Sequence, residues 1–188
     1  MAATSAAGKA QAPTLGRTDS SAPSFEQLLL ACERSAVHLE MRDVYTPADP
    51  WFRAWQSGDR AEFERRLQRP WLDLVHQVTR RGVELRRIRV ISEPVSQYIA
   101  FEHATTGSNV EAGEQVRWLA RRAAGGLLLP ANDCWVFDER LVRFAFFDGN
   151  GQFLGTELCD DPTVAQQCTA AFEEAWGRAV SHGEYELR

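Results

Sequence analysis

The sequence predicts a single layered domain that combines helices and strands, an α/β (α+β) fold with a mixed, mostly antiparallel sheet of about six strands flanked by helices. Three observations predict it. Apolar residues recur at helical spacing in some segments, and in others they alternate with polar residues or run together. In the second half of the chain, three apolar runs follow one another with only short polar turns between them. The length of 188 residues, with 44% hydrophobic and 25% charged residues, suits one domain with one core.

The first 23 residues differ in composition from the rest. They are rich in Ala, Ser, Thr, Gly and Pro, and Leu15 is their one clear large apolar residue after the initiator methionine. Such a segment cannot bury enough apolar surface to offset the loss of chain entropy, so we expect a disordered tail over residues 1–23. Ser24 and Gln27 have the spacing of a capping box before an apolar run. This predicts that the single domain covers residues 24–188.

Helices and strands alternate in the first half of this domain. Residues 37–42 alternate between apolar and polar side chains, the pattern of a half-buried strand. We interpret the aromatic segment at 51–55 as a turn. Asp59 predicts the start of a helix, which Pro70 interrupts or restarts, and Gly82 ends the helical region.

The second half is rich in strands. One more strand candidate closes the first half at 83–91, and four follow in the second half at 116–119, 134–137, 141–147 and 153–158. The first of these is β-branched and typical of a central strand, and Pro94 after it predicts the start of a helix. The last three are separated by short turns, so they predict an antiparallel meander. Asp161 and Pro162 cap a final helix.

The composition excludes several classes of function. The chain has 20 arginines and one lysine, Lys9, which lies in the expected tail. The folded part therefore lacks the ammonium group that phosphate-loop nucleotidases, Schiff-base enzymes, kinases and Ser–Lys hydrolases require. The net charge of −5 argues against a dedicated nucleic-acid or membrane-surface binder. No apolar run approaches the ~20 residues of a membrane span.

Cysteine and histidine spacing predicts neither a metal site nor a cofactor. The four cysteines form no C-x-x-C pair, and the four histidines form no H-x-x-x-H pair. The N-terminal segment has no apolar region of the kind that secretory signals contain. We therefore expect a cytoplasmic protein with reduced, mostly buried thiols.

Charge is distributed unevenly along the chain. Residues 60–92 contain nine arginines and four acidic residues, whereas residues 93–188 contain seven arginines and fifteen acidic residues. Ion pairs between the two regions are the favoured interpretation, and an anion-binding patch is the alternative.

Polar residues on the predicted strands and helices could converge on one site. The candidate ligand-binding residues are Glu40, Arg42, Tyr45, Arg89, Tyr98, Glu102, Glu114, Arg117 and Trp135. In layered α/β domains ligands collect where such residues meet at strand ends. Two guanidinium groups beside carboxylates would suit a zwitterionic or carboxylated ligand. The other interpretation is a buried salt-bridge network that stabilises the sheet. In an enzyme, Glu102 or His103 would serve as the acid or base.

Part of the chain resembles phospholipase-D-like domains. The resemblance rests on Arg81–Val90 after an amphipathic helix, and on Asp138 followed by two strands and a helix that begins at Pro162. It implies a phospholipase-D-like fold. The catalytic H-x-K-x-x-x-x-D motif of that family is absent, so the resemblance implies a degenerate, non-catalytic half domain without phosphodiesterase activity.

Residues from about 25 to 185 more closely resemble an actinobacterial domain family found largely in Streptomyces-like genomes. The matching stretches are 39–45, 89–94, 97–98, 112–117 and 133–138. Genes of this family often lie beside helix-turn-helix regulators, which implies a regulatory partner. The family brings no assigned chemistry with it.

Two hypotheses follow. The first is a non-catalytic accessory or ligand-sensing protein of a regulatory or specialised-metabolism locus, which binds a small polar or anionic metabolite and acts through a partner. The second is a small tailoring or hydrolytic enzyme of specialised metabolism that uses Glu102 or His103.

Overall fold

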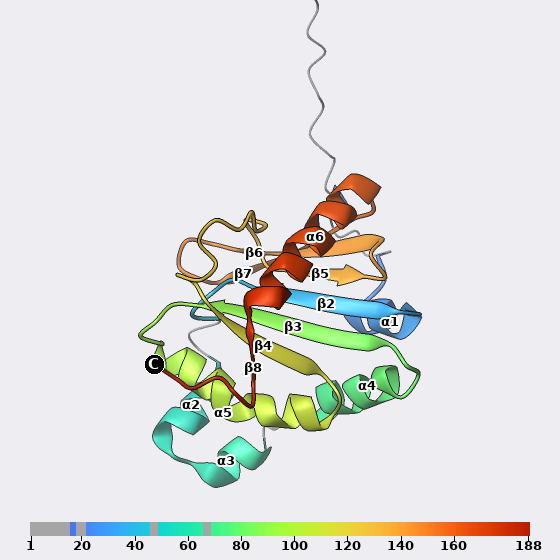
Figure 1. The fold of residues 1–188 in the computed structure, drawn as a ribbon. Helices are drawn as coiled ribbons and strands as arrows, with labels where there is room; N and C mark the ends of the chain where they lie inside the picture. The colour runs from blue at the N-terminus through green and yellow to red at the C-terminus, as the bar shows by residue number, and fades with distance from the viewer. Residues whose placement is uncertain (1–15, 18–21, 46–48, 66–68) are drawn as a thin grey trace, which may run out of the picture.

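A single mixed sheet forms the centre of the molecule. The computed structural model describes residues 16–17, 22–45, 49–65 and 69–188. The strands are β1 (Gly16–Arg17), β2 (Ser35–Glu40), β3 (Glu84–Ile91), β4 (Gln115–Ala120), β5 (Cys134–Phe137), β6 (Leu141–Phe147), β7 (Phe153–Cys159) and β8 (Val180–Ser181). They lie in the order β1-β7-β6-β5-β2-β3-β4-β8 (Figure 1). Strands β2, β3 and β4 are parallel and the other neighbours are antiparallel. The predicted mixed, mostly antiparallel sheet is confirmed.

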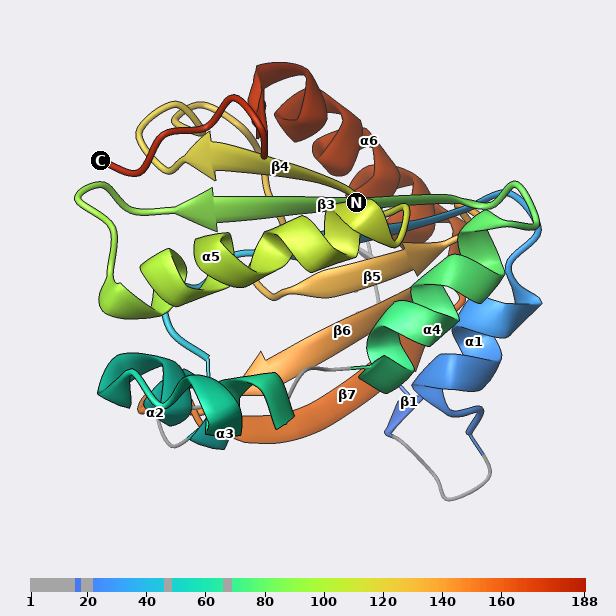
Figure 2. The same cartoon turned by 90° about the horizontal axis from the view of Figure 1, so that it is seen from below.

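Helices cover both faces of this sheet. They are α1 (Phe25–Ala31), α2 (Pro50–Ser57), α3 (Arg60–Arg65), α4 (Arg69–Thr79), α5 (Gln97–Glu111) and α6 (Pro162–Arg178). Helix α6 crosses one face alone, whereas α1, α4 and α5 lie on the opposite face, with α2 and α3 beyond them (Figures 1 and 2). We refer to these as the α6 face and the α5 face.

Alternation along the strands divides the core between the two faces. Val37 and Leu39 of β2 pack in the cluster that contains the buried residues of α6. Ala36 of the same strand belongs to a second cluster with α1 and α4. Both faces of β2 are therefore covered, and the prediction of a half-buried strand is wrong. A single strand shows the alternation, but it does not show that helices cover the polar face as well.

The predicted helix starts at both ends of the domain have the expected caps. Ser24 Oγ accepts from the Gln27 backbone N–H at 3.2 Å, and Gln27 Oε1 accepts from the Ser24 N–H at 2.7 Å. Asp161 accepts from the Thr163 N–H at 2.7 Å, directly before Pro162. Each cap satisfies backbone donors that a helix start leaves unpaired.

Two local predictions in the first half are wrong. The aromatic segment 51–55 lies in α2 and not in a turn, because Asp49 accepts from the Trp51 N–H and Gly58 ends the helix with φ +71°. Helix α5 does not begin at Pro94, which follows a cis peptide bond, but after the cap Ser96.

The two shortest strands lie outside the sequence prediction. Gly16–Arg17 pairs with β7, and Val180–Ser181 pairs with β4. Two residues cannot show periodicity. The tail predicted for residues 1–23 falls mostly outside the described residues. All four cysteines are free and buried.

Candidate ligand-binding site

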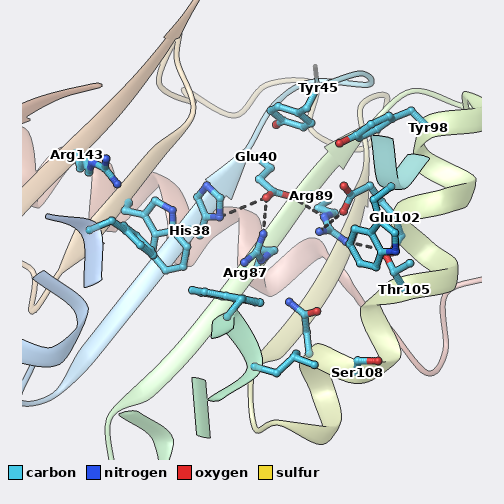
Figure 3. A pocket seen from close by; sticks show the side chains of 16 residues that line it. His38, Glu40, Tyr45, Arg87, Arg89, Tyr98, Glu102, Thr105, Ser108 and Arg143 are labelled. Carbon is cyan, nitrogen blue, oxygen red and sulfur yellow. Dashed lines mark hydrogen bonds and ion pairs between the residues drawn. The ribbon is translucent and has the colours of Figure 1, made fainter. Parts of the chain in front are cut away.

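A pocket of about 370 Å³ opens on the α5 face of the sheet. Its floor comes from β2, β3, β5 and β6, and its walls come from α1, α2, α4 and α5 (Figure 3). Sixteen residues line it: Phe25, His38, Glu40, Tyr45, Trp51, Trp71, Leu72, Arg87, Arg89, Tyr98, Glu102, Thr105, Ser108, Asn109, Trp135 and Arg143. The size is at the small end of the range for small-molecule sites.

Glu40 stands at the centre of the floor between two arginines. Its Oε1 accepts from Arg87 Nη1 and its Oε2 from Arg89 Nε, both at 2.5 Å (Figure 3). The strands bring the three together because the parallel register of β2 and β3 places Glu40 opposite Arg89, with Arg87 two residues earlier on the same face. Charge-assisted hydrogen bonds of this kind are the stronger ones in proteins.

The two arginines have further carboxylate partners away from Glu40. Arg87 Nε donates to Glu114 Oε1 at 2.7 Å, and Asn109 donates to the second oxygen of Glu114 at 2.6 Å. Arg89 forms an ion pair with Glu102 of α5. We call Glu40, Arg87, Arg89, Glu102 and Glu114 the floor network. It links β2, β3, α5 and the start of β4.

The floor network keeps its central groups ionised. Burial raises the pKa of Glu40, but Arg89 and Arg87 outweigh burial and hold that pKa well below its usual range. Burial likewise lowers the pKa of Arg87 and of Arg89, and the neighbouring carboxylates outweigh it, so both pKa values are raised. These residues behave as the buried salt-bridge network that the sequence left as one interpretation. The arginine-rich segment also pairs across the other face, where Arg86 donates to Glu173 of α6.

The floor network has one more carboxylate than it has arginines, and Glu102 is a carboxylate whose ionised form this arrangement disfavours. Two arginines face three glutamates in it. Burial raises the pKa of Glu102, Arg89 lowers it, and Glu40 raises it further, with a net increase. The Glu102 end of the pocket therefore favours a hydrogen-bond donor.

A cation without a carboxylate partner lies at the opposite end. Arg143 of β6 is half-buried, its Nε donates to Thr156 Oγ1 at 3.1 Å, and its guanidinium lies 5.2 Å from the centre of the Phe25 ring. Among the residues that the structure describes, no carboxylate lies within ion-pair distance of Arg143. Burial lowers its pKa. Arginine nevertheless stays protonated in proteins, so this group presents an unneutralised positive charge.

His38 lies between Glu40 and Arg143. Its ring stacks on Trp135 with 4.2 Å between centroids and 15° between planes, and its Nδ1 lies 3.4 Å from Glu40 Oε1. Burial, together with the nearby arginines, lowers the pKa of His38 to about 3 although Glu40 opposes them. The imidazole is therefore neutral at physiological pH.

Aromatic side chains form the walls at both ends. Near Arg143, the Phe25 ring lies 5.1 Å from that of Trp135 and 6.0 Å from that of Trp71. Near Glu102, Tyr45 and Tyr98 lie 6.1 Å apart. The pocket thus places charged groups between apolar walls, where water screens them less than at an open surface.

Residues 23–187 match the family model described as domain of unknown function, DUF6879. The chain belongs to the DUF6879 family. No protein with curated annotation matches the sequence. The DUF6879 domain has no helix, among those the structure describes, that is long and apolar enough to span a membrane. The described residues also hold no group of three or more histidine, cysteine and acidic side chains arranged for a metal ion.

Solved structures similar to the DUF6879 domain include phospholipase D family members. Nuc from Salmonella typhimurium, a phospholipase D family member, has a TM-score of 0.49 and 9% identity, with 83% of this chain and 86% of that chain covered. NucT from Helicobacter pylori has 0.45 and 10%, with 83% and 87% covered. Phosphatidylserine synthase from Haemophilus influenzae has 0.42 and 12%, with 86% and 37% covered.

Six of the predicted site residues line the pocket of the DUF6879 domain. They are Glu40, Tyr45, Arg89, Tyr98, Glu102 and Trp135. Glu114 is 1% exposed and lies behind Arg87, so it supports the pocket without lining it.

Three predicted residues lie elsewhere. Arg117 is opposite Ile88 in the sheet and therefore points to the α6 face, where it lies 4.3 Å from the Trp176 ring. His103 follows Glu102 by one position and so projects from another side of α5, with its Nε2 3.2 Å from the Tyr185 carbonyl oxygen. Arg42 lies beyond the end of β2, over the Phe147 ring. Of the two acid–base candidates, Glu102 lines the pocket and His103 lies outside it.

The residues that line the pocket but were not predicted from the sequence include Arg143, His38, Phe25, Trp51 and Trp71. One signal for Arg143 was available. It is the single charged residue in the apolar strand β6, which normally indicates either an exposed strand face or a functional group. Nothing in the local sequence indicates that α1 and α4 bring their aromatic side chains to the same place.

Proposed function

We propose that the protein binds a small polar metabolite with a carboxylate or similar anionic group in this pocket, and that it acts as a non-catalytic ligand-sensing or accessory protein. The observation that carries the proposal is Arg143. A half-buried guanidinium in a pocket wall has lost part of its hydration, and no described carboxylate replaces it. A bound anion would supply the missing partner.

The floor network supports this proposal because it leaves Arg143 available. Arg87 and Arg89 are 8% and 6% exposed and already hold Glu40, Glu102 and Glu114. A site whose charged side chains are held by one another needs little rearrangement on binding, which favours affinity. The distribution of charge also gives the ligand a direction, with its anion at Arg143 and a hydrogen-bond donor at Glu102.

A thermal-shift screen of small carboxylates tests the proposal. The panel contains aliphatic, aromatic, hydroxylated and amino acids, with inorganic phosphate as a second anion, and titration calorimetry follows each hit. We expect Arg143→Gln to weaken binding about ten-fold or more, the effect of losing one charge-assisted hydrogen bond. The control is Arg122→Gln, which removes the same charge at an exposed position outside the pocket. Absence of any hit, or full affinity in Arg143→Gln, would overturn the proposal.

The regulatory part of the proposal concerns a partner. The sequence resemblance to an actinobacterial family encoded beside helix-turn-helix regulators supports such a partner in the cytoplasm. Affinity capture from the native organism, with and without the ligand from the screen, tests it. Recovery of a helix-turn-helix protein whose amount depends on the ligand would support the proposal, and capture of no such protein under both conditions would contradict it.

A second candidate function is favoured by one observation at Glu102. A carboxylate in a pocket with a raised pKa is suited to general acid–base chemistry. We propose as the alternative a small enzyme that uses Glu102 alone, since His103 lies outside the pocket. Conversion of a bound ligand by the wild type, but not by Glu102→Gln with retained binding, would support this alternative. Unchanged ligand after prolonged incubation would support the sensor.

A further inference from the structure

His38 is a buried imidazole without a hydrogen bond. Its side chain is 14% exposed, and Nδ1 is fully enclosed without a hydrogen-bond partner among the residues that the structure describes. None of those residues hydrogen-bonds Nε2 either, and the ring lines the pocket. Nδ1 faces Glu40 Oε1 at 3.4 Å, whereas Nε2 has no partner among the described residues and belongs to a ring that lines the pocket. Nε2 is therefore the nitrogen that a ligand can reach.

The surroundings of His38 determine which nitrogen carries the proton. The carboxylate of Glu40 lies 3.4 Å from Nδ1, and the adjacent arginines keep Glu40 ionised. A lone pair on Nδ1 would face this negative charge, whereas an N–H would be attracted to it. The neutral ring therefore carries its proton on Nδ1, and Nε2 is a hydrogen-bond acceptor.

Strand register places this acceptor in one row with Arg143. His38 of β2 is opposite Trp135 of β5, and Trp135 is opposite Arg143 of β6. The three side chains share the α5 face, and the backbones of the two outer strands lie about 10 Å apart because neighbouring strands are about 4.8 Å apart. His38 and Arg143 therefore lie on either side of Trp135 in the floor of the same pocket, and Figure 3 shows His38 between Glu40 and Arg143.

We propose that the ligand carries a neutral hydrogen-bond donor, such as a hydroxyl group, close to its carboxylate. The donor binds His38 Nε2 and the carboxylate binds Arg143. This inference rests on the proposed binding function, and it narrows the ligand class from carboxylates in general to hydroxy acids and related compounds. A 2-hydroxy acid with an aromatic side chain fits, because the aromatic part can pack against Phe25 and Trp71.

Three probes that differ in one group test the assignment. They are 3-phenyllactate, which has carboxylate and hydroxyl, 3-phenylpropanoate, which lacks the hydroxyl, and 2-methoxy-3-phenylpropanoate, which has an acceptor but no donor. Titration calorimetry gives the affinity of each for the wild type, for His38→Phe and for Arg143→Gln. In His38→Phe the new side chain can still stack on Trp135, but it lacks both ring nitrogens of histidine.

We expect the wild type to bind 3-phenyllactate about five- to ten-fold more tightly than either analogue, as for one buried hydrogen bond. His38→Phe should abolish this preference, while its affinity for 3-phenylpropanoate stays within about two-fold of the wild-type value. Arg143→Gln should lower the affinity for all three probes. Nitrogen-15 spectra of the free protein should show the proton on Nδ1 of His38.

Different outcomes test the donor assignment to His38 and the proposed binding of an anion at Arg143. A preference that survives in His38→Phe, a proton on Nε2 in the free protein, or failure of 3-phenyllactate to bind while other carboxylates bind through Arg143 would overturn the donor assignment alone. If no carboxylate binds, or if Arg143→Gln changes nothing, both the function and the inference fall.

Discussion

Removal of the Arg89 guanidinium should strongly destabilise the domain. Arg89 is 6% exposed and holds two carboxylates, Glu40 through Nε and Glu102 through an ion pair, and it also donates to Thr106 Oγ1. In Arg89→Ala, Glu40 keeps one arginine, Glu102 keeps none, and both stay in the protein interior. Breaking a buried pair in this way costs about 3–5 kcal/mol. For a domain of this size the fall in Tm would be about 6–20 °C.

The opposite change at the same ion pair should have a much smaller effect. Glu102→Gln leaves two arginines facing two glutamates, so it removes the surplus negative charge of the floor network. The raised pKa of Glu102 means that the folded state binds this proton more tightly than the unfolded state does. The stability that Glu102 contributes is therefore present below its unfolded pKa and lost as pH rises through its folded pKa. We expect Glu102→Gln to change the free energy of unfolding by less than about 1 kcal/mol at neutral pH.

Urea unfolding of both variants, followed by far-ultraviolet circular dichroism, measures the two free energies. Glu40 supplies an internal check on the sign. Because its pKa is lowered by its arginines, the stability it contributes is present above its unfolded pKa and is lost as pH falls through its folded pKa. The loss caused by Arg89→Ala should therefore shrink in acid. A loss below about 1 kcal/mol in Arg89→Ala, or a loss in Glu102→Gln as large as that in Arg89→Ala, would refute the account of the floor network.

Four other outcomes are expected. Burial raises the pKa of Asp133 from 3.8 to about 6, so the stability that Asp133 contributes is fully present below the lower value and lost as pH rises through the higher one. Urea unfolding from about pH 4 to about pH 8 should show a decline in the free energy of unfolding on the order of 2–3 kcal/mol, and Asp133→Asn should remove this decline. The same pH dependence in the wild type and in Asp133→Asn would contradict this prediction. Arg117→Gln should leave ligand affinity unchanged, because Arg117 lies on the α6 face; weaker binding in calorimetry would place it in the site. The four buried cysteines should react with a thiol reagent only after unfolding. Cleavage of a generic phosphodiester should be absent, and turnover that depends on a pocket residue would contradict the non-catalytic interpretation.

Periodicity predicts the elements of this fold well where it is long enough to be seen. The six longer strands lie where alternation or apolar runs place them, and Ser24 and Asp161 mark real helix starts because capping is a local interaction. The failures have equally local causes. Trp51–Trp55 lacks the apolar periodicity of a longer helix, and Pro94 lies two residues before Ser96, the residue that caps α5. The pairing order of the strands depends on contacts between distant segments and cannot be derived from any one segment.

Only those site residues that share a face of one strand pair or of one helix could be predicted from the sequence. Glu40 and Arg89 share a face of the sheet by period two, and Tyr98 and Glu102 share a face of a helix by spacing of four, so their convergence follows from the pattern. Arg117 was a candidate for the site but lies on the other face of the sheet, because only the register of β3 and β4 shows which side its strand presents. Arg143 and His38 meet through two successive strand pairings, neither of which has a signal in the sequence.

The two interpretations of the polar strand residues, a buried network and a ligand site, are compatible because different arginines fulfil them. Arg87 and Arg89 are neutralised by glutamates and hold β2, β3 and α5 together. Their pairing fixes Glu40, Glu40 in turn fixes the proton on His38, and His38 then presents an acceptor beside the one pocket arginine that lacks a carboxylate among the described residues. A network that only stabilised the sheet would have no need of an open pocket above it, nor of an uncompensated guanidinium at its edge. The ion pairs hold the floor of the proposed site in place, and Arg143 and His38 are the residues that would contact the ligand.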